Sequence, residues 1–303
     1  MRKKIFFALG IIFLFSFSSA FFSCASQGAI RAEEYFAIGM AYYDLGNYAE
    51  AERWLIRAAG SDRTMIASEY NLGRIAFETL RFEEAALYFE GILRRDPDNI
   101  MALRAAAYSR IRNGDFAVAE MHYEHILSLL SESIDDGFNY SLVLYSMGKF
   151  EECEEVLLNF QEALEVNHSA VLLLARAQRA QNKIDAVNSF ERWLSLTEHT
   201  SSQGLFEYAQ ALEAAGFYAR AIEIYNDAID SLVQDTSSLS SGQIRFNLAR
   251  LLLIADPHNP LGIAEMQTAI RDGFNNTTAM EELLLDERIS IDHRDELRRF
   301  ISQ

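Results

Sequence analysis

Few residues in this 303-residue chain have types and spacings that could support chemistry. His122 and His125 lie three residues apart, so a helix would present both imidazoles on one face, as a metal site requires. Zinc needs three or four protein ligands and no third ligand is evident, so we expect two solvated histidines, no metal and no cofactor. The sequence contains no glycine-rich phosphate loop, HExxH pair or serine elbow. We therefore expect that the protein is not an enzyme.

A cysteine near the amino terminus indicates a different kind of chemistry. A basic start is followed by an uncharged apolar run at 5–22 and then by Cys24, which is the order of a secretory signal. The arrangement resembles the lipobox of bacterial lipoproteins, in a relaxed form because Phe21 stands where leucine is usual. That resemblance implies a signal peptide at 1–23, diacylglycerol on Cys24, a short linker at 24–31, and an exported, membrane-anchored protein in the periplasm or at the cell surface. An uncleaved signal anchor and plain secretion remain alternatives, since about 18 apolar residues approach the length that spans a bilayer.

The composition favours a large helical array with an acidic surface. Half of the residues are apolar, and three are proline, which suits long helices. The formal net charge is −17, and the chain without its first 23 residues, which hold three bases and no acid, carries −20. Such a surface is repelled by phosphate backbones, so we expect no nucleic-acid partner. With Cys24 and Cys153 as the two cysteines, no disulfide framework is expected.

The sequence repeats itself every 34 residues over six units. Small residues recur at Gly39, Gly73, Ala107, Ser141, Ala175 and Ala209. Twelve residues later in each unit stand Ala51, Ala85, Ala119, Cys153, Val187 and Ala221. Between them, a turn position is occupied by Gly46, Leu80, Gly114, Gly148, Asn182 and Gly216. Small side chains permit two helices to approach closely, and glycine at a turn accepts left-handed backbone angles, so each unit should be two antiparallel helices.

This pattern resembles the tetratricopeptide repeat, a helix-turn-helix unit of 34 residues. The second unit matches best, at Tyr70–Gly73, Phe82–Ala85 and Asp96–Asn99. The resemblance implies an all-α fold, a right-handed superhelix of antiparallel helix pairs. The expected divisions are six regular units at 32–233, a loop at 234–242, an irregular seventh unit at 243–276 and capping helices at 277–303.

Two positions depart from the pattern of large and small residues. Glu191 stands where a large apolar residue is expected and Phe190 is beside it, so the second helix of the fifth unit should be rotated or loosely packed. Cys153 occupies a small-residue position, which predicts a buried structural thiol.

In the repeat family, the first helix of each unit lines a concave groove through its second, fifth, ninth and twelfth residues, whose spacing keeps them on one helical face. Carried onto this chain, the stripe predicts a partner-binding groove of Phe36, Met40, Tyr43, Tyr70, Arg74, Phe77, Arg104, Tyr108, Arg112, Phe138, Tyr145, Arg176, Arg179 and Phe206, with Met101 and Leu142 in the same stripe. Aromatic residues and arginine are enriched at interface hot spots. We expect a protein or peptide with apolar anchors and some acidic groups. Alternatively, these residues pad the interior and pair with local acids.

The function expected from these observations is a non-enzymatic interaction scaffold or adaptor of the bacterial cell envelope. The partner is another protein or peptide, and the membrane is reached through the lipid on Cys24. The alternative is a ligand- or lipid-binding helical lipoprotein, for example one associated with a transporter and its solute-binding protein. An enclosed apolar cavity would favour the alternative, and an open groove favours the scaffold.

Overall fold

The computed structural model describes residues 29–197, 201–232, 239–256 and 258–301. Within these ranges the chain forms helices joined by turns and loops, with no strand. They form two compact units, one ending at Met147 and the other starting at Gly148. The proposed signal peptide, Cys24 and residues 234–238 of the expected loop lie outside the described residues. None of the described helices is long and apolar enough to cross a bilayer.

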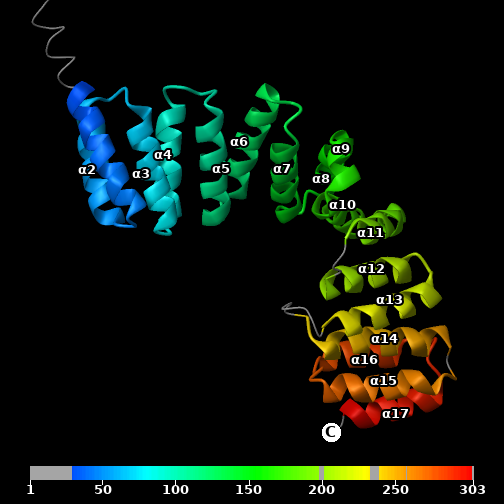
Figure 1. Ribbon diagram of the computed structural model, residues 1–303. Coiled ribbons are helices and arrows are strands. Elements are labelled where there is room, and N and C mark those ends of the chain that lie inside the picture. Colours follow the sequence, from blue (N-terminus) through cyan, green and yellow to red (C-terminus); the bar gives the residue numbers. More distant parts are fainter. Residues whose placement is uncertain (1–28, 198–200, 233–238, 257, 302–303) are drawn as a thin grey trace, which may run out of the picture. The chain divides into compact units, whose positions relative to one another are not determined.

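The first unit is a row of helices, each packed beside the one that follows it (Figure 1). Asparagine side chains cap the amino-terminal ends of two of them, since Asn47 Oδ1 accepts a bond from Glu50 N, and Asn99 Oδ1 accepts one from Ala102 N. The helices are residues 29–44, α2 (Tyr48–Ser61), α3 (Ile66–Glu78), α4 (Phe82–Leu93), α5 (Ile100–Asn113), α6 (Phe116–Leu129) and α7 (Ile134–Ser146).

The second unit continues the helical pattern with one addition. A six-residue helix, α9, stands between α8 and α10, where the repeat pattern predicts a single second helix followed by a turn. The helices are α8 (Phe150–Asn159), α9 (Gln161–Val166), α10 (His168–Ala180), α11 (Asp185–Leu196), α12 (Ser202–Ala214), α13 (Tyr218–Ser231), α14 (Ser241–Ala255), α15 (Pro260–Arg271), α16 (Thr277–Leu285) and α17 (Ile291–Ile301).

The turn position has the same backbone conformation in all six repeats. Gly46, Gly114, Gly148 and Gly216 have φ between 71° and 88°, and the two residues that replace glycine, Leu80 and Asn182, have φ of 61° and 56°. This left-handed conformation lets the chain leave one helix and enter the next within three residues. The repeat therefore imposes the conformation even where the side chain opposes it.

The small residues of the repeat lie where paired helices touch. A Cβ atom added to Gly73 would stand 2.7 Å from the ring of Phe89 on α4, and one added to Gly39 would stand 2.9 Å from Cγ of Leu55 on α2. These distances are shorter than atoms tolerate, so a larger residue would push the helices apart. The requirement for small residues is thus confirmed at the first two units.

Two sequence predictions in the second unit are also confirmed. Cys153 is fully buried, and burial raises the pKa of its thiol to about 12, as a packed structural cysteine requires. Phe190 is fully buried in α11, while Glu191 is exposed and accepts a 3.1 Å hydrogen bond from Tyr208. Of the two possibilities for this helix, rotation holds, because Phe190 supplies the apolar contact that position 191 lacks.

The last four helices share one apolar core. Phe246 of α14 stacks on Phe274 with ring centroids 4.1 Å apart, and Met266 of α15 is fully buried in the same cluster. Leu283 of α16 and Leu297 of α17 complete this cluster. Residues 277–301 therefore cover apolar surface of the α14–α15 pair, which a terminal helix pair would otherwise expose.

Candidate functional site: a groove across α3, α5 and α7

The first helices of three successive pairs in the first unit line two adjoining pockets. One pocket, of about 450 Å³, lies between α3 and α5 and is lined by Tyr70, Arg74, Phe77, Glu78, Phe89, Met101, Arg104, Ala105, Tyr108 and Ser109. The other, of about 330 Å³, lies between α5 and α7 and is lined by Arg104, Tyr108, Ile111, Phe116, Tyr123, Asp136, Asn139, Leu142, Val143 and Ser146. Arg104 and Tyr108 belong to both, so the pockets form one groove with α5 at its centre. We call this the α5 groove.

Exposed apolar side chains border the α5 groove. Met101 is 62% exposed, Tyr108 49% and Leu142 40%. Tyr108 stacks on Phe77 of α3 with centroids 5.1 Å apart, which fixes its ring across the two helices. A rigid aromatic ring beside adaptable methionine is a surface suited to apolar anchors of a partner.

Arg104 in the α5 groove is bound to a buried acid of the next helix pair. Its Nε donates to Oδ1 of Asp136 at 2.9 Å and its Nη2 to Oδ2 at 2.6 Å. Asp136 also accepts a hydrogen bond of 2.6 Å from Ser133 Oγ, and its side chain is 3% exposed. Burial alone would raise the pKa of Asp136, but the hydrogen bonds from Arg104 and Ser133 outweigh it and lower the pKa. The charge of Arg104 is therefore largely neutralised within the protein.

Arg74, in contrast, contacts neutral partners. Its Nη1 donates to Oδ1 of Asn71 at 3.0 Å, its Nη2 donates to the hydroxyl of Tyr43 at 3.0 Å, and its guanidinium lies 4.7 Å from the centre of the Tyr43 ring. Among the described residues no carboxylate is within ion-pair distance of Arg74. An acidic group on a partner could thus bind Arg74, on the α3 side of the groove, without displacing a bound carboxylate, although Glu78 lines the same pocket one helical turn away.

The aromatic residues predicted in the first two units hold the helices together. Phe36 and Tyr43 pack against the buried cluster around Leu55, and Tyr70 and Phe77 pack against the cluster around Phe89. Tyr70 and Phe77 also line the α5 groove, whereas Phe36 and Tyr43 line neither of its pockets. Met40 is half-buried on the first helix and lines neither pocket.

Arg112 and the two aromatics predicted on α7 do not line the α5 groove. The guanidinium of Arg112 lies 4.4 Å from the ring centre of Phe82, so it covers the turn between α3 and α4. Phe138 and Tyr145 are half-buried, and on α7 the pocket is lined by Leu142, at its predicted position, and by residues that each follow a predicted position by one, such as Asn139 and Ser146. The predicted stripe therefore holds at Leu142 and is displaced by one residue at Phe138 and Tyr145.

In the second unit the predicted residues are engaged internally. Arg176 Nε donates to Glu207 Oε2 at 2.6 Å, and Arg179 Nη1 donates to Gln210 Oε1 at 3.0 Å. Phe206 is 7% exposed and packs against Tyr225, so it belongs to the core and differs from the predicted surface position. The described residues of this unit therefore give the predicted groove less support than α3 and α5 do.

The acids that neutralise these arginines could have been found from the repeat period. Asp136 follows Arg104 by 32 residues and Glu207 follows Arg176 by 31, close to one repeat. Residues about one repeat apart in sequence lie on the first helices of neighbouring units. A base and an acid with this separation can therefore form an ion pair. The alternative prediction, that groove arginines pair with local acids, is confirmed for Arg104 and Arg176.

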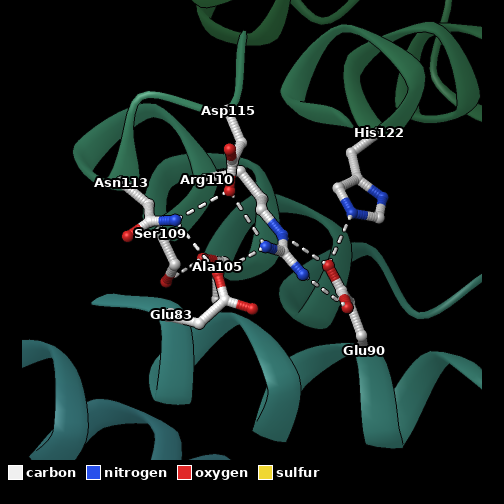
Figure 2. Close-up of polar contacts among 8 residues, drawn as sticks. All are labelled: Glu83, Glu90, Ala105, Ser109, Arg110, Asn113, Asp115 and His122. Atoms are coloured by element: carbon white, nitrogen blue, oxygen red, sulfur yellow. Dashed lines mark hydrogen bonds and ion pairs between the residues drawn. The ribbon is translucent and has the colours of Figure 1, made fainter. Parts of the chain in front are cut away.

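A second polar cluster joins α4, α5 and α6 around Arg110 (Figure 2). Its guanidinium, 12% exposed, donates to both carboxylate oxygens of Glu90 at 2.7 and 2.9 Å, to Glu83 at 2.7 Å and to Asp115 at 3.0 Å. These charge-assisted bonds raise the pKa of Arg110 and connect two successive helix pairs. The 34-residue pattern did not predict this cluster.

The two histidines of α6 have different surroundings, which corrects one prediction. His125 is partly exposed, with 37% of its side chain accessible, and its Nε2 lies 2.9 Å from Asp98 Oδ1. His122 is 15% exposed, and its Nε2 lies 3.8 Å from Glu90 Oε1, beyond hydrogen-bonding distance. Burial lowers the pKa of His122, so the prediction of two solvated histidines is wrong for this residue. In the described part of the chain no group of three or more His, Cys, Asp or Glu side chains could hold a metal ion.

Comparison with known proteins agrees with the helical repeat. The sequence model of the tetratricopeptide repeat matches residues 36–100 and 70–127. Together with the paired helices and the shared turn conformation, this match shows that residues 36–127 form tetratricopeptide repeats, and the rest of the described chain continues the same helical-pair fold. It is also similar to an uncharacterized lipoprotein of Treponema pallidum (strain Nichols), with 27% identity over 146 residues, 48% of this chain and 74% of that protein.

Solved structures show the same fold at low sequence identity. A tetratricopeptide repeat protein from Parabacteroides merdae is similar with a TM-score of 0.57 and 18% identity, covering 84% of this chain and 97% of that one. YrrB, described as a TPR protein with an unusual peptide-binding site, is similar with a TM-score of 0.53 and 15% identity, covering 59% of this chain and 93% of that one. At such identities the likeness concerns the fold.

Proposed function

We propose that the protein is a non-enzymatic interaction scaffold of the bacterial cell envelope that binds a partner protein or peptide in the α5 groove. The observation that carries the proposal is the pair of adjoining pockets across α3, α5 and α7, bordered by exposed Met101, Tyr108 and Leu142. The peptide-binding site named for YrrB, which shares the fold, supports a binding role for these repeats.

The chemistry of the α5 groove suggests what the partner presents. Two apolar side chains would fill the pockets on either side of Tyr108, and an acidic group would reach Arg74. A second acidic group at Arg104 would meet a guanidinium already paired with Asp136, so it would gain less there than at Arg74. Arg104 therefore acts mainly to hold α5 beside α7, and we assign recognition of charge to Arg74.

The proposal includes a lipid anchor on Cys24 and export to the periplasm or the cell surface. It is supported by the basic, apolar and small-residue order before Cys24 and by the likeness to a lipoprotein of Treponema pallidum. The division into signal peptide, linker, six repeats, irregular seventh unit and carboxyl-terminal cap is part of the same proposal. Metabolic labelling with a palmitate analogue tests the anchor, because the wild type should be labelled and Cys24→Ser should not.

A matched pair of methionines tests the groove. Met101 lines the α5 groove and is 62% exposed, whereas Met121 on α6 is 66% exposed and lines neither pocket of the groove. Lipidated protein would be used to capture partners from detergent-solubilised envelopes, followed by mass spectrometry. Met101→Ala should reduce capture of a specific partner several-fold, by about 1 kcal/mol or more if the residue is an anchor, and Met121→Ala should not. Equal capture by both variants would show that the partner binds elsewhere.

Small ligands are the rival occupants of the groove. Native mass spectrometry of protein purified from envelopes would show a bound lipid or small molecule as a fixed mass increment. An increment lost in Met101→Ala and retained in Met121→Ala would favour a ligand-binding lipoprotein. The exposed rim of the groove favours a polypeptide, which can extend beyond the pockets.

A further inference from the structure

The first helix pair carries partly exposed apolar and aromatic side chains, among them Tyr35, Ile38 and Trp54. On α2, Ala51, Leu55 and Ala58 are buried, and Trp54, at the edge of the same helical face, is half-buried. Ile38 on the first helix is 37% exposed. No described helix precedes residue 29, so no earlier repeat covers these side chains in the described part of the chain.

Aromatic contacts organise this surface. The rings of Tyr35 and Trp54 are 5.6 Å apart, and the guanidinium of Arg57 lies 4.6 Å from the centre of the Trp54 ring. We call Tyr35, Ile38, Trp54 and Arg57 the amino-terminal face. Tyrosine and tryptophan favour the level of lipid headgroups, where one side of the ring is apolar and the other is wet, and arginine binds phosphate.

We propose that the amino-terminal face rests on the headgroups of the membrane to which Cys24 is attached. This inference depends on the lipid anchor in the proposed function. Four residues lie between Cys24 and residue 29, the first described residue of the first helix, and even when fully extended these five Cα steps span at most about 18 Å. The first helix pair is therefore held close to the bilayer surface, so weak contacts suffice to orient it.

The acids around the face indicate which lipids it suits. Glu34 lies on the first helix and Glu50 on α2. Glu50 forms an ion pair with Arg53 at 2.7 Å. Anionic lipids would be repelled by these carboxylates, so contact relies on apolar and aromatic burial and on one arginine–phosphate contact. Phosphatidylethanolamine, which has a phosphate and no net charge, fits this surface, and binding should depend little on salt.

Tryptophan fluorescence gives a direct test, because the chain has two tryptophans. Trp193 is 2% exposed in the second unit, and Trp54 is on the proposed contact surface. The lipidated protein would be reconstituted into phosphatidylethanolamine vesicles that contain brominated lipid, which quenches nearby tryptophan. We expect quenching in the wild type and its loss in Trp54→Phe. Equal quenching in both, or none in either, would overturn the proposal.

A second comparison measures the strength of the contact without the lipid. The unlipidated Cys24→Ser chain should bind the same vesicles weakly, and adding Tyr35→Ser, Ile38→Ser and Trp54→Ser should weaken binding by at least about tenfold, since apolar burial is lost. Met121→Ser, at a residue 66% exposed on α6, is the matched control and should have no effect. An equal loss with the control would also overturn the proposal.

Failure of the anchor can be distinguished from failure of the face. Intact mass of the purified protein reports whether lipid is attached. If it is absent, a Cys24→Ser chain with an amino-terminal hexahistidine can be held on nickel-chelating lipid. Quenching of Trp54 there would keep the face and reject the anchor. Absence of quenching together with dimerisation in sedimentation would mean that a second copy covers the face, which overturns the proposal.

Discussion

The left-handed turn position offers a quantitative test of the repeat, through Leu80→Gly. Leu80 has a φ of 61°, and it is 69% exposed. Removing its side chain therefore loses little buried apolar area. A non-glycine residue in this region costs about 1–2 kcal/mol, and glycine loosens the unfolded chain by about 0.4–1 kcal/mol. The difference predicts a gain of about 0.5–1 kcal/mol in the free energy of unfolding.

The reverse change at an equivalent position is the matched control. Gly114 has a φ of 88°, and an added Cβ would meet nothing within 4 Å, so Gly114→Ala introduces backbone strain without a clash. It should lose about 0.5–1 kcal/mol. Asn182→Gly should gain less than Leu80→Gly, because asparagine tolerates the left-handed region better than leucine does.

Urea and thermal unfolding followed by circular dichroism provide the assay. A change of about 1 kcal/mol shifts the thermal midpoint by roughly 2–4 °C in a unit of about 150 residues. Leu80→Gly should raise the midpoint, and Gly114→Ala should lower it. A lower midpoint for Leu80→Gly would show that packing by the leucine side chain outweighs strain, and would refute this account of the turn.

Three further predictions concern packing, burial and pH. Gly73→Ala should destabilise by about 1–3 kcal/mol because its Cβ would meet Phe89, whereas Gly60→Ala, with open space and a helical backbone, should stabilise by about 0.5–1 kcal/mol; equal effects in urea unfolding would contradict the close approach. Cys153 should resist iodoacetamide in the native protein and react in denaturant, because it is buried and its pKa is raised to about 12; rapid native labelling by mass spectrometry would disprove this. His122 has a lowered pKa when folded, so the unfolded chain binds the proton first and stability falls as pH drops below about 6.5. Unfolding midpoints between about pH 7.5 and about pH 5.5 should therefore fall less in His122→Gln than in the wild type, and an equal fall would place the pH dependence elsewhere.

The period and the turn chemistry were predictable because they repeat. A single glycine indicates little, but glycine or a substitute every 34 residues identifies the turn, and the structure gives Leu80 and Asn182 the conformation of their glycine counterparts. The positions that require small residues were predictable for the same reason. What escaped prediction was not periodic, such as the extra helix α9.

The state of the candidate site was only partly predictable. The stripe placed Arg74, Arg104 and Tyr108 in one groove, but it could not show that Arg104 is bound by Asp136 and that Arg74 lacks a carboxylate partner among the described residues. Which acid an arginine side chain reaches depends on the relative positions of the helices, and residue type does not specify those positions. His122 was misjudged likewise, since burial between two helices depends on the rotation of α6.

The central claim, that the α5 groove binds a partner, is tested most directly by photocrosslinking in cells. A photoreactive residue would replace Tyr108, which belongs to both pockets, and in a parallel strain would replace Met121, which lies outside them. The account predicts a discrete crosslinked species from position 108 that is absent from position 121 and weakened by Arg74→Ala. The same species from both positions, or a species from position 121 alone, would contradict it.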